Sequence, residues 1–313
     1  MSSEIKNRYE FTLLFEVENG NPNGDPDAGN APRIDAETGY GIVTDVCIKR
    51  KIRNYIDVAK KDGEHFRIYV RNGIPLDTNR KWAYEETETK TPMDKNGKVT
   101  ADEPEKEEFK KIKHFMCDNF YDIRAFGAVM TLKYNCGQVR GPVQMGFAKS
   151  IDMISPQEIG ITSCTYANEG EKSSKMGRKN IVPYGLYRVD GYISANLANT
   201  EYGGTGFDEE DLQLLWQALI NMFELDHAAA RGKMASRALI VFKHESELGN
   251  CPAYQLFEAI DVHHVEGVVV PRSYKDYVVN INKDAVPKGV EMIDFIPGSV
   301  IISSRQSNKK ESR

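Results

Sequence analysis

Two segments of the chain have apolar side chains at helical spacing. Residues 44–61 predict an amphipathic helix that starts at Thr44 or Asp45 and stops in the run Lys60 to Gly63. The side chains on its apolar stripe are Ile48, Ile52, Tyr55, Ile56 and Ala59. Residues 207–226, FDEEDLQLLWQALINMFELD, predict a second helix with Asp208 as its N-cap and acidic residues in its first turn. Its predicted buried face consists of Leu212, Leu215, Trp216, Leu219, Ile220 and Phe223.

Other segments are rich in β-forming residues. Residues 8–18, RYEFTLLFEVE, predict a first strand that ends at the loop GNPNGDPD, residues 20–27. Strand character returns in residues 121–155, 182–194 and 237–244. With the insertions between these segments left out, the order is strand, helix, strand, strand, helix, strand. This order predicts an α+β fold with the ferredoxin-like (RRM-like) βαββαβ arrangement.

The composition is that of a soluble globular protein. Of the 313 residues, 40% are hydrophobic and 28% are charged, and no run of about 18 apolar residues occurs. The N-terminus MSSEIKNRYE lacks the apolar stretch of a signal peptide, so we expect a cytoplasmic protein without membrane contact. The five cysteines form no CxxC pair and are expected to be reduced thiols. A net charge of −5 argues against a uniformly basic nucleic-acid binder but allows a local basic strip.

Two basic clusters interrupt this acidic background. Residues 44–61 hold six Lys or Arg against two Asp, and Lys49, Arg53 and Lys60 align beside the apolar stripe. The second cluster consists of Lys172, Lys175, Arg178 and Lys179. Each cluster could be a solvated surface, but two of them in a ferredoxin-like fold favour binding of a phosphate backbone. The RNP1 pattern of RNA-binding sheets is missing, so base stacking on the sheet is not the expected mode.

The acidic loop admits two interpretations. Asp25, Asp27, Asp35 and Asp45 lie within 21 residues and could collect Mg²⁺. Alternatively, the Asn and Asp residues stabilise turns, with Gly24 supplying a positive φ, and composition favours this interpretation. Adjacent histidines in a strand point to opposite faces, and no HExxH, GxSxG or GxxxxGK[ST] motif occurs. We therefore predict no catalytic residue, no metal and no cofactor.

A series of motifs, in order along the chain, resembles one protein family. GNPNGDPD, PRIDAETGYG and VTDVCIKRKIR are similar to the start of the type I CRISPR-associated backbone subunits, the Cas-seven (Csd/Csh-type) family of the RAMP superfamily. DIRAFG, GPVQ, MGRK, VPYGLYR and RALIVFKH resemble its later landmarks. The resemblance covers nearly the whole chain, and its Csd-like pattern suggests the type I-C complex.

The resemblance implies an RRM-like palm with inserted fingers and thumb. The palm would comprise residues 1–61, 119–156 and 183–298, the fingers 62–118, the thumb 157–182 and a C-terminal tail 299–313. Family members line up as several copies along one CRISPR guide RNA and form the spine of the surveillance complex Cascade. The implied partners are guide RNA, further copies in a head-to-tail filament, other Cascade subunits, target DNA paired with the guide, and a recruited helicase-nuclease.

The same resemblance implies a non-catalytic RNA-binding role for named residues. Lys49, Arg50 and Arg53 would bind guide phosphates, helped by Asn21, Asn23 and Gly24 of the loop. The thumb would contribute Lys175, Arg178 and Lys179, with Met176 or Tyr166 as a wedge beside a displaced base. The alternatives are a metal-dependent endoribonuclease that uses Asp25 and Asp27, and a protein-interaction module that binds no RNA.

Overall fold

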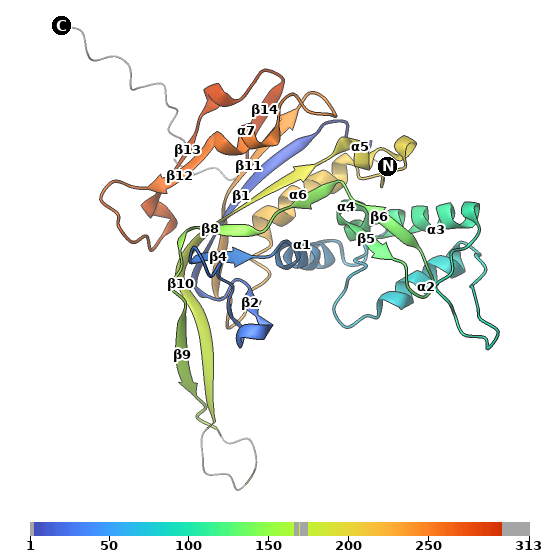
Figure 1. The fold of residues 1–313 in the computed structure, drawn as a ribbon, viewed down its shortest axis with the longest axis horizontal. Coiled ribbons are helices and arrows are strands. Elements are labelled where there is room, and N and C mark those ends of the chain that lie inside the picture. The colour runs from blue at the N-terminus through green and yellow to red at the C-terminus, as the bar shows by residue number, and fades with distance from the viewer. Residues whose placement is uncertain (1–2, 166–168, 170–174, 296–313) are drawn as a thin grey trace.

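The central element of the fold is an antiparallel eight-stranded sheet. The computed structural model describes residues 3–165, 169 and 175–295. The strands run in the order β14-β11-β1-β10-β8-β4, and β7 and β9 pair with β10 away from this path. Their bounds are β1 Tyr9–Gly20, β4 Tyr40–Val43, β7 Val143–Met145, β8 Ala148–Met153, β9 Gln157–Thr162, β10 Met176–Ile193, β11 Lys233–His244 and β14 Val290–Asp294. The prediction of a mixed α+β protein is confirmed, with the antiparallel sheet at its centre (Figure 1).

Strand β1 is the innermost strand, because it pairs with β10 on one edge and with β11 on the other. Successive side chains of a strand point to opposite faces. On one face Phe11, Leu13 and Phe15 join a core with the two predicted helices, α1 (Asp45–Lys60) and α6 (Glu209–Asn221). On the other face Leu14 joins a second core under α7 (Ala253–Glu258), β12 (Ile260–His264) and β13 (Tyr277–Ile281).

The two helices agree closely with the periodicity of the sequence. Thr44 caps α1 by accepting a hydrogen bond from the backbone N–H of Cys47, and Lys61 ends it at a φ of 51°. Asp208 caps α6 in a reciprocal capping box with Asp211. Two details differ from the prediction: Ala59 is exposed, and α6 ends at Asn221 although the sequence predicted a helix as far as residue 226. Lys51 of α1 is buried and forms an ion pair with Asp226 outside the helix.

The structure corrects the prediction for residues 121–126. The sequence predicted a strand there, and the structure has helix α4 (Tyr121–Phe126). Asp122 is buried and accepts hydrogen bonds from the backbone N–H groups of Tyr69 (2.7 Å) and Val70 (3.1 Å). Arg124 binds both carboxylate oxygens of Asp211, at 2.6 and 2.7 Å. These partners lie far away in the sequence, and they override the β propensity of the segment.

A helical lobe projects from one side of the sheet (Figure 1). It contains α2 (Leu76–Glu86), α3 (Lys106–Asn119), β5 (Gly127–Met130) and β6 (Gly137–Arg140). Its core includes Tyr84 and Met116 from the helices and continues through Met130 to Cys136. The fingers predicted at 62–118 lie in this lobe, while its core also takes in later residues. No helix in the described ranges is long and apolar enough to cross a membrane.

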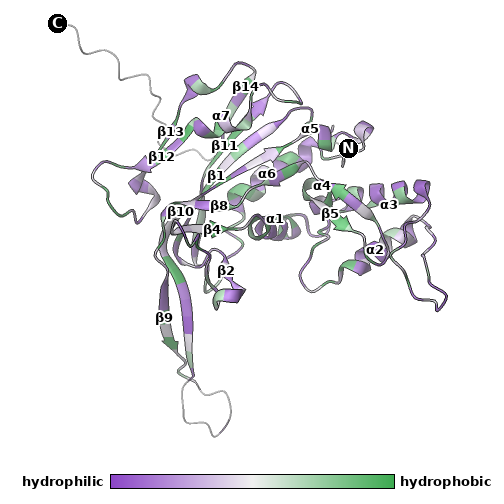
Figure 2. Cartoon of the chain, viewed as in Figure 1, coloured by the Kyte–Doolittle hydropathy of each residue, from purple (hydrophilic) through white to green (hydrophobic). Residues whose placement is uncertain are grey.

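A two-stranded ribbon projects in another direction (Figure 1). It consists of β9 and the first part of β10, paired from Gln157↔Ile181 to Thr162↔Met176. Every residue of β9 is exposed, and apolar and polar side chains are mixed along the ribbon (Figure 2). The sequence predicted an exposed arm here but no strands. Tyr166, Lys172 and the tail 299–313 lie outside the described residues.

Removal of one partner of the buried ion pair between Arg124 and Asp211 should destabilise the fold strongly. The two side chains are 7% and 2% exposed, and removal of one partner leaves the other charge buried and unpaired. We expect Arg124→Met to lower the free energy of unfolding by about 3–5 kcal/mol in urea titrations. Lys60→Met, which removes a more exposed pair with Glu210, should cost about 1 kcal/mol or less. Equal effects of the two substitutions would contradict this assignment.

Candidate nucleic-acid interface

The turn after β1 is shaped by the three loop residues that the sequence singled out. Asn21 is buried and donates from Nδ2 to the carbonyl oxygen of Asn30, at 2.7 Å. Asn23 accepts through Oδ1 from both the backbone N–H and the hydroxyl of Thr44, each at 3.0 Å. A Cβ at Gly24 would collide with the side-chain oxygen of Asn30. These contacts hold the turn tightly against the first residues of α1.

The carboxylates of Asp25 and Asp35 have separate partners. Asp25 accepts from the backbone N–H of Asp27 at 3.1 Å and lies 3.3 Å from Arg33. The hydroxyl of Thr38 donates to Asp35, and this hydrogen bond lowers the pKa of that carboxyl. Within the ranges that the structure describes, no three His, Cys, Asp or Glu side chains are grouped to hold a metal ion. The contacts of the loop are those of a turn.

The cations of α1 are held by acceptors of the protein itself. Lys49 lies 3.0 Å from Asp45, Arg53 lies 2.7 Å from the buried Asp122, and Arg50 donates to the carbonyl oxygen of Val70 at 2.7 Å. Burial, followed by the charge of Arg53, lowers the pKa of Arg50. Lys49 and Arg53 both lie over the ring of Phe126, at 5.6 and 5.3 Å from its centre. The three side chains are therefore gathered on the side of α1 that meets α4.

The cations of the ribbon are much more accessible. Lys175, Arg178 and Lys179 are exposed, and the side chain of Met176 is 81% exposed. Arg178 forms an ion pair with Glu158 at 3.0 Å. Neither lysine has an ion pair with any residue that the structure describes. Strand alternation places Met176 and Arg178 on one face of the ribbon and Lys179 on the other.

The turn and the ribbon begin side by side. Gly20, the last residue of β1, pairs with Val182 of β10, and the ribbon starts at the next residue, Ile181. The side chain of Asn180 donates to the carbonyl oxygen of Gly29 at 3.3 Å, which links ribbon and turn directly. Two segments that are about 150 residues apart in the sequence thus form one surface.

The structure adds a third segment, residues 225–232, that the sequence analysis did not single out. The backbone N–H of Asn21 donates to the carbonyl oxygen of Ala230 at 2.7 Å. Asp226 in this segment forms ion pairs with Lys51 of α1 and, at 2.8 Å, with Arg231. A signal was present in the sequence: three consecutive alanines stand between His227 and Arg231, shortly after the clearest helix.

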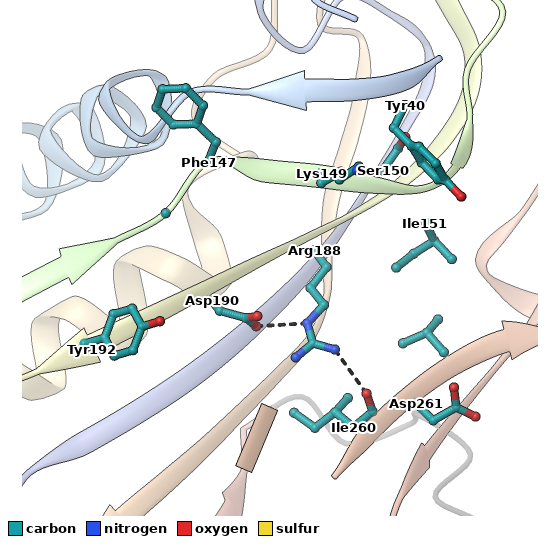
Figure 3. A pocket seen from close by; sticks show the side chains of 12 residues that line it. Tyr40, Phe147, Lys149, Ser150, Ile151, Arg188, Asp190, Tyr192, Ile260 and Asp261 are labelled. Atoms are coloured by element: carbon teal, nitrogen blue, oxygen red, sulfur yellow. Dashed lines mark hydrogen bonds and ion pairs between the residues drawn. The ribbon is translucent and has the colours of Figure 1, made fainter. Parts of the chain in front are cut away.

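An open cleft of about 640 Å³ lies elsewhere, between β8, β10 and β12 (Figure 3). Arg188, Asp190 and Tyr192 line it from the face of β10 opposite to Tyr187 and Val189, which pack towards α1 and α6. Arg188 binds Asp190 at 2.9 Å and the carbonyl oxygen of Ile260 at 3.1 Å. The charged groups that line the cleft are two cations, Lys149 and Arg188, and two carboxylates, Asp190 and Asp261. None of the predicted site residues lines this cleft.

Comparisons with known proteins point to one family. The model of the family "CRISPR-associated protein Cas7" matches residues 7–282. A curated protein of Haloferax volcanii, described as CRISPR-associated protein Cas7, is 26% identical in an alignment of 300 positions that covers 88% of this chain and 81% of that protein. A solved chain of a "CRISPR RNA-guided surveillance complex, pre-nicking" aligns with a TM-score of 0.46 and 13% identity over 75% of this chain and 78% of its own, a similarity too weak to support an inference. Because the family model spans most of the chain, the protein belongs to the Cas7 family of CRISPR-associated proteins.

Proposed function

We propose that this protein is a non-catalytic backbone subunit of a type I-C CRISPR surveillance complex (Cascade) that holds the guide RNA along its phosphate backbone. Family membership is the main support for the proposal. The turn after β1, the basic ribbon and α1 together provide the proposed surface for RNA. The guide is then presented for pairing with target DNA, and other Cascade subunits and a helicase-nuclease join the complex in the cytoplasm. The specificity for the target comes from base pairing, while the protein contacts the backbone.

The strand order supports an RRM-like palm at the centre of this subunit. The chain passes through β1, α1, β8, β10, α6 and β11, and the strands lie side by side in the order β11-β1-β10-β8. A βαββαβ unit of the ferredoxin-like type has this connectivity. In this proposal the helical lobe provides the fingers, and residues 157–182 provide the thumb.

The ribbon supplies the main phosphate contacts in this proposal, because its cations are exposed. Lys49 and Arg50 each use one acceptor of the protein, which leaves further N–H groups for a phosphate. Arg53 is different, since its removal would leave the buried Asp122 without its ion-pair partner. Met176, an exposed apolar side chain between two cations, is the proposed wedge beside a displaced base.

An alternative function, a metal-dependent endoribonuclease, rests on Asp25 and Asp27. The two residues lie in the turn that we propose for guide binding, which is the observation in its favour. Asp25 is engaged with Arg33 and with the backbone of Asp27, and these contacts support a role in the turn. We therefore place catalysis second.

The double substitution Lys175→Ala with Lys179→Ala should weaken binding of single-stranded RNA without unfolding the protein. Each lost phosphate contact on a single strand reduces the slope of log affinity against log salt by about 0.7. Fluorescence anisotropy over a range of KCl concentrations measures this slope. Lys81→Ala with Lys98→Ala, two exposed lysines of the helical lobe, is the matched control. An unchanged slope in the ribbon variant would remove the ribbon from the interface.

Replacement of residues 158–180 by a short Gly/Ser linker should leave the monomer folded, because β9 is exposed at every position. A ribbon that reaches the next copy makes a head-to-tail contact, which propagates into a filament. The variant should therefore form shorter assemblies, measured by mass photometry, and leave guide RNA open to added nuclease. Replacement of the exposed turn 94–98 serves as the control. Full-length assemblies with protected RNA in the ribbon variant would refute the thumb assignment.

The purified protein should not shorten bound or complementary RNA in the presence of Mg²⁺ or Mn²⁺. Denaturing gels with end-labelled RNA test this expectation. If cleavage occurs and Asp25→Asn abolishes it while the fold stays intact by circular dichroism, the endoribonuclease is correct and the scaffold is not.

A further inference from the structure

Residues 225–232, which connect α6 to β11, form the third segment of the interface and lie directly against the turn after β1. Besides the hydrogen bond from Asn21 to Ala230, the carbonyl oxygen of Ala230 would lie only 3.1 Å from a Cβ added at Gly20. Glycine at position 20 therefore lets the two backbones approach closely. The turn and this segment are thus in direct backbone contact.

Positive charges outnumber negative charges in the group of side chains around Cys47 at this junction. Burial raises the pKa of the Cys47 thiol, and four charged side chains lie close enough to shift it as well, namely Lys51, Asp226, Arg231 and Arg33. With Asp25 as the partner of Arg33, three cations face two carboxylates. The sulfur of Cys47 itself donates to the carbonyl oxygen of Pro22 at 3.5 Å, which places this group of charges at the turn.

Arg231 is the most exposed of the three cations in this group. Lys51 is buried, and its ion pair already neutralises Asp226. The side chain of Arg231 is 36% exposed, and its recorded contact with Asp226 uses Nε. A guanidinium has five N–H donors, so a phosphate can bind at its outer nitrogens while Nε stays on Asp226. The alanines at 228–230 are small and leave room for a nucleic-acid backbone beside Arg231.

We infer that Arg231 binds a phosphate of the guide RNA and that residues 225–232 line the guide path beside the turn. This inference rests on the proposed function and adds to it a binding residue on a segment outside palm strands, fingers and thumb. Asp226 orients the guanidinium, and the neutralisation of Asp226 by Lys51 leaves the charge of Arg231 available to the phosphate.

The test compares two arginines of nearly equal exposure. Arg231→Gln removes the proposed phosphate contact, whereas Arg237→Gln removes a side chain that is 35% exposed, lies 3.5 Å from Glu16 and lies over the ring of Tyr274. With a single-stranded RNA probe, Arg231→Gln should weaken binding about tenfold and lower the salt slope by about 0.7. Arg231→Lys should retain most of the slope, and Arg237→Gln should match the wild type.

A second variant distinguishes a loss of RNA binding from a loss of folding. Ala229→Glu adds a carboxylate to an exposed position of the segment without touching the ion pairs, and it should weaken RNA binding while the melting temperature stays that of the wild type. If Arg231→Gln and Ala229→Glu both bind as the wild type does, while the Lys175 and Lys179 variant is impaired, the inference is wrong and the proposed function stands. If the wild type does not bind RNA, both fail.

Discussion

The pairing of β1 with β10 is the constraint on which the rest of the interface depends. Their register is continuous from Tyr9↔Ile193 to Gly20↔Val182, where β1 ends and β10 extends beyond the shared ladder. Strand β1 enters the turn, and β10 enters the ribbon. A one-residue slip would turn every side chain of β1 to the wrong face, so the buried side chains of β1 fix the register. The same register therefore decides where the turn and the ribbon stand relative to each other.

The distribution of charge explains how a basic helix fits an acidic protein. Lys49, Lys51 and Arg53 of α1 each contact a carboxylate from the chain, and the partners of Lys51 and Arg53 come from distant segments. These contacts position α1 between α4 and residues 225–232. The ribbon lysines have no such partners among the described residues, and they keep their charge at the surface. In the proposed function, α1 therefore organises the surface, and the ribbon and Arg231 present charge to RNA.

Much of the fold could be read from the sequence because it rests on local periodicity. The caps at Thr44 and Asp208 and the strand predicted at 8–18 appear in the structure within about two residues. The strand predicted at 237–244 ends where expected but begins four residues earlier, at Lys233. The need for glycine at position 24 was also local, but the predicted positive φ of Gly24 is wrong: among the described residues of the loop Gly24 has no positive φ, and glycine is needed because Asn30 lies too close for a Cβ. The family resemblance came from the same short motifs.

Only the tertiary structure decided the partners of charged residues. Residues 121–126 became a helix because Asp122 and Arg124 are bound by residues 53, 69, 70 and 211. Residues 157–181 form a ribbon because antiparallel pairing joins β9 to the first part of β10. The composition of these residues does not predict either strand. Arg231 lies beside the turn because it forms an ion pair with Asp226, which also forms an ion pair with Lys51 of α1. The sequence by itself determined where α1, α6 and β1 begin and which of their faces are apolar, since neighbours along the chain set those properties. Long-range ion pairs and strand pairing depend on which segments meet in space, and packing of the whole chain determines that.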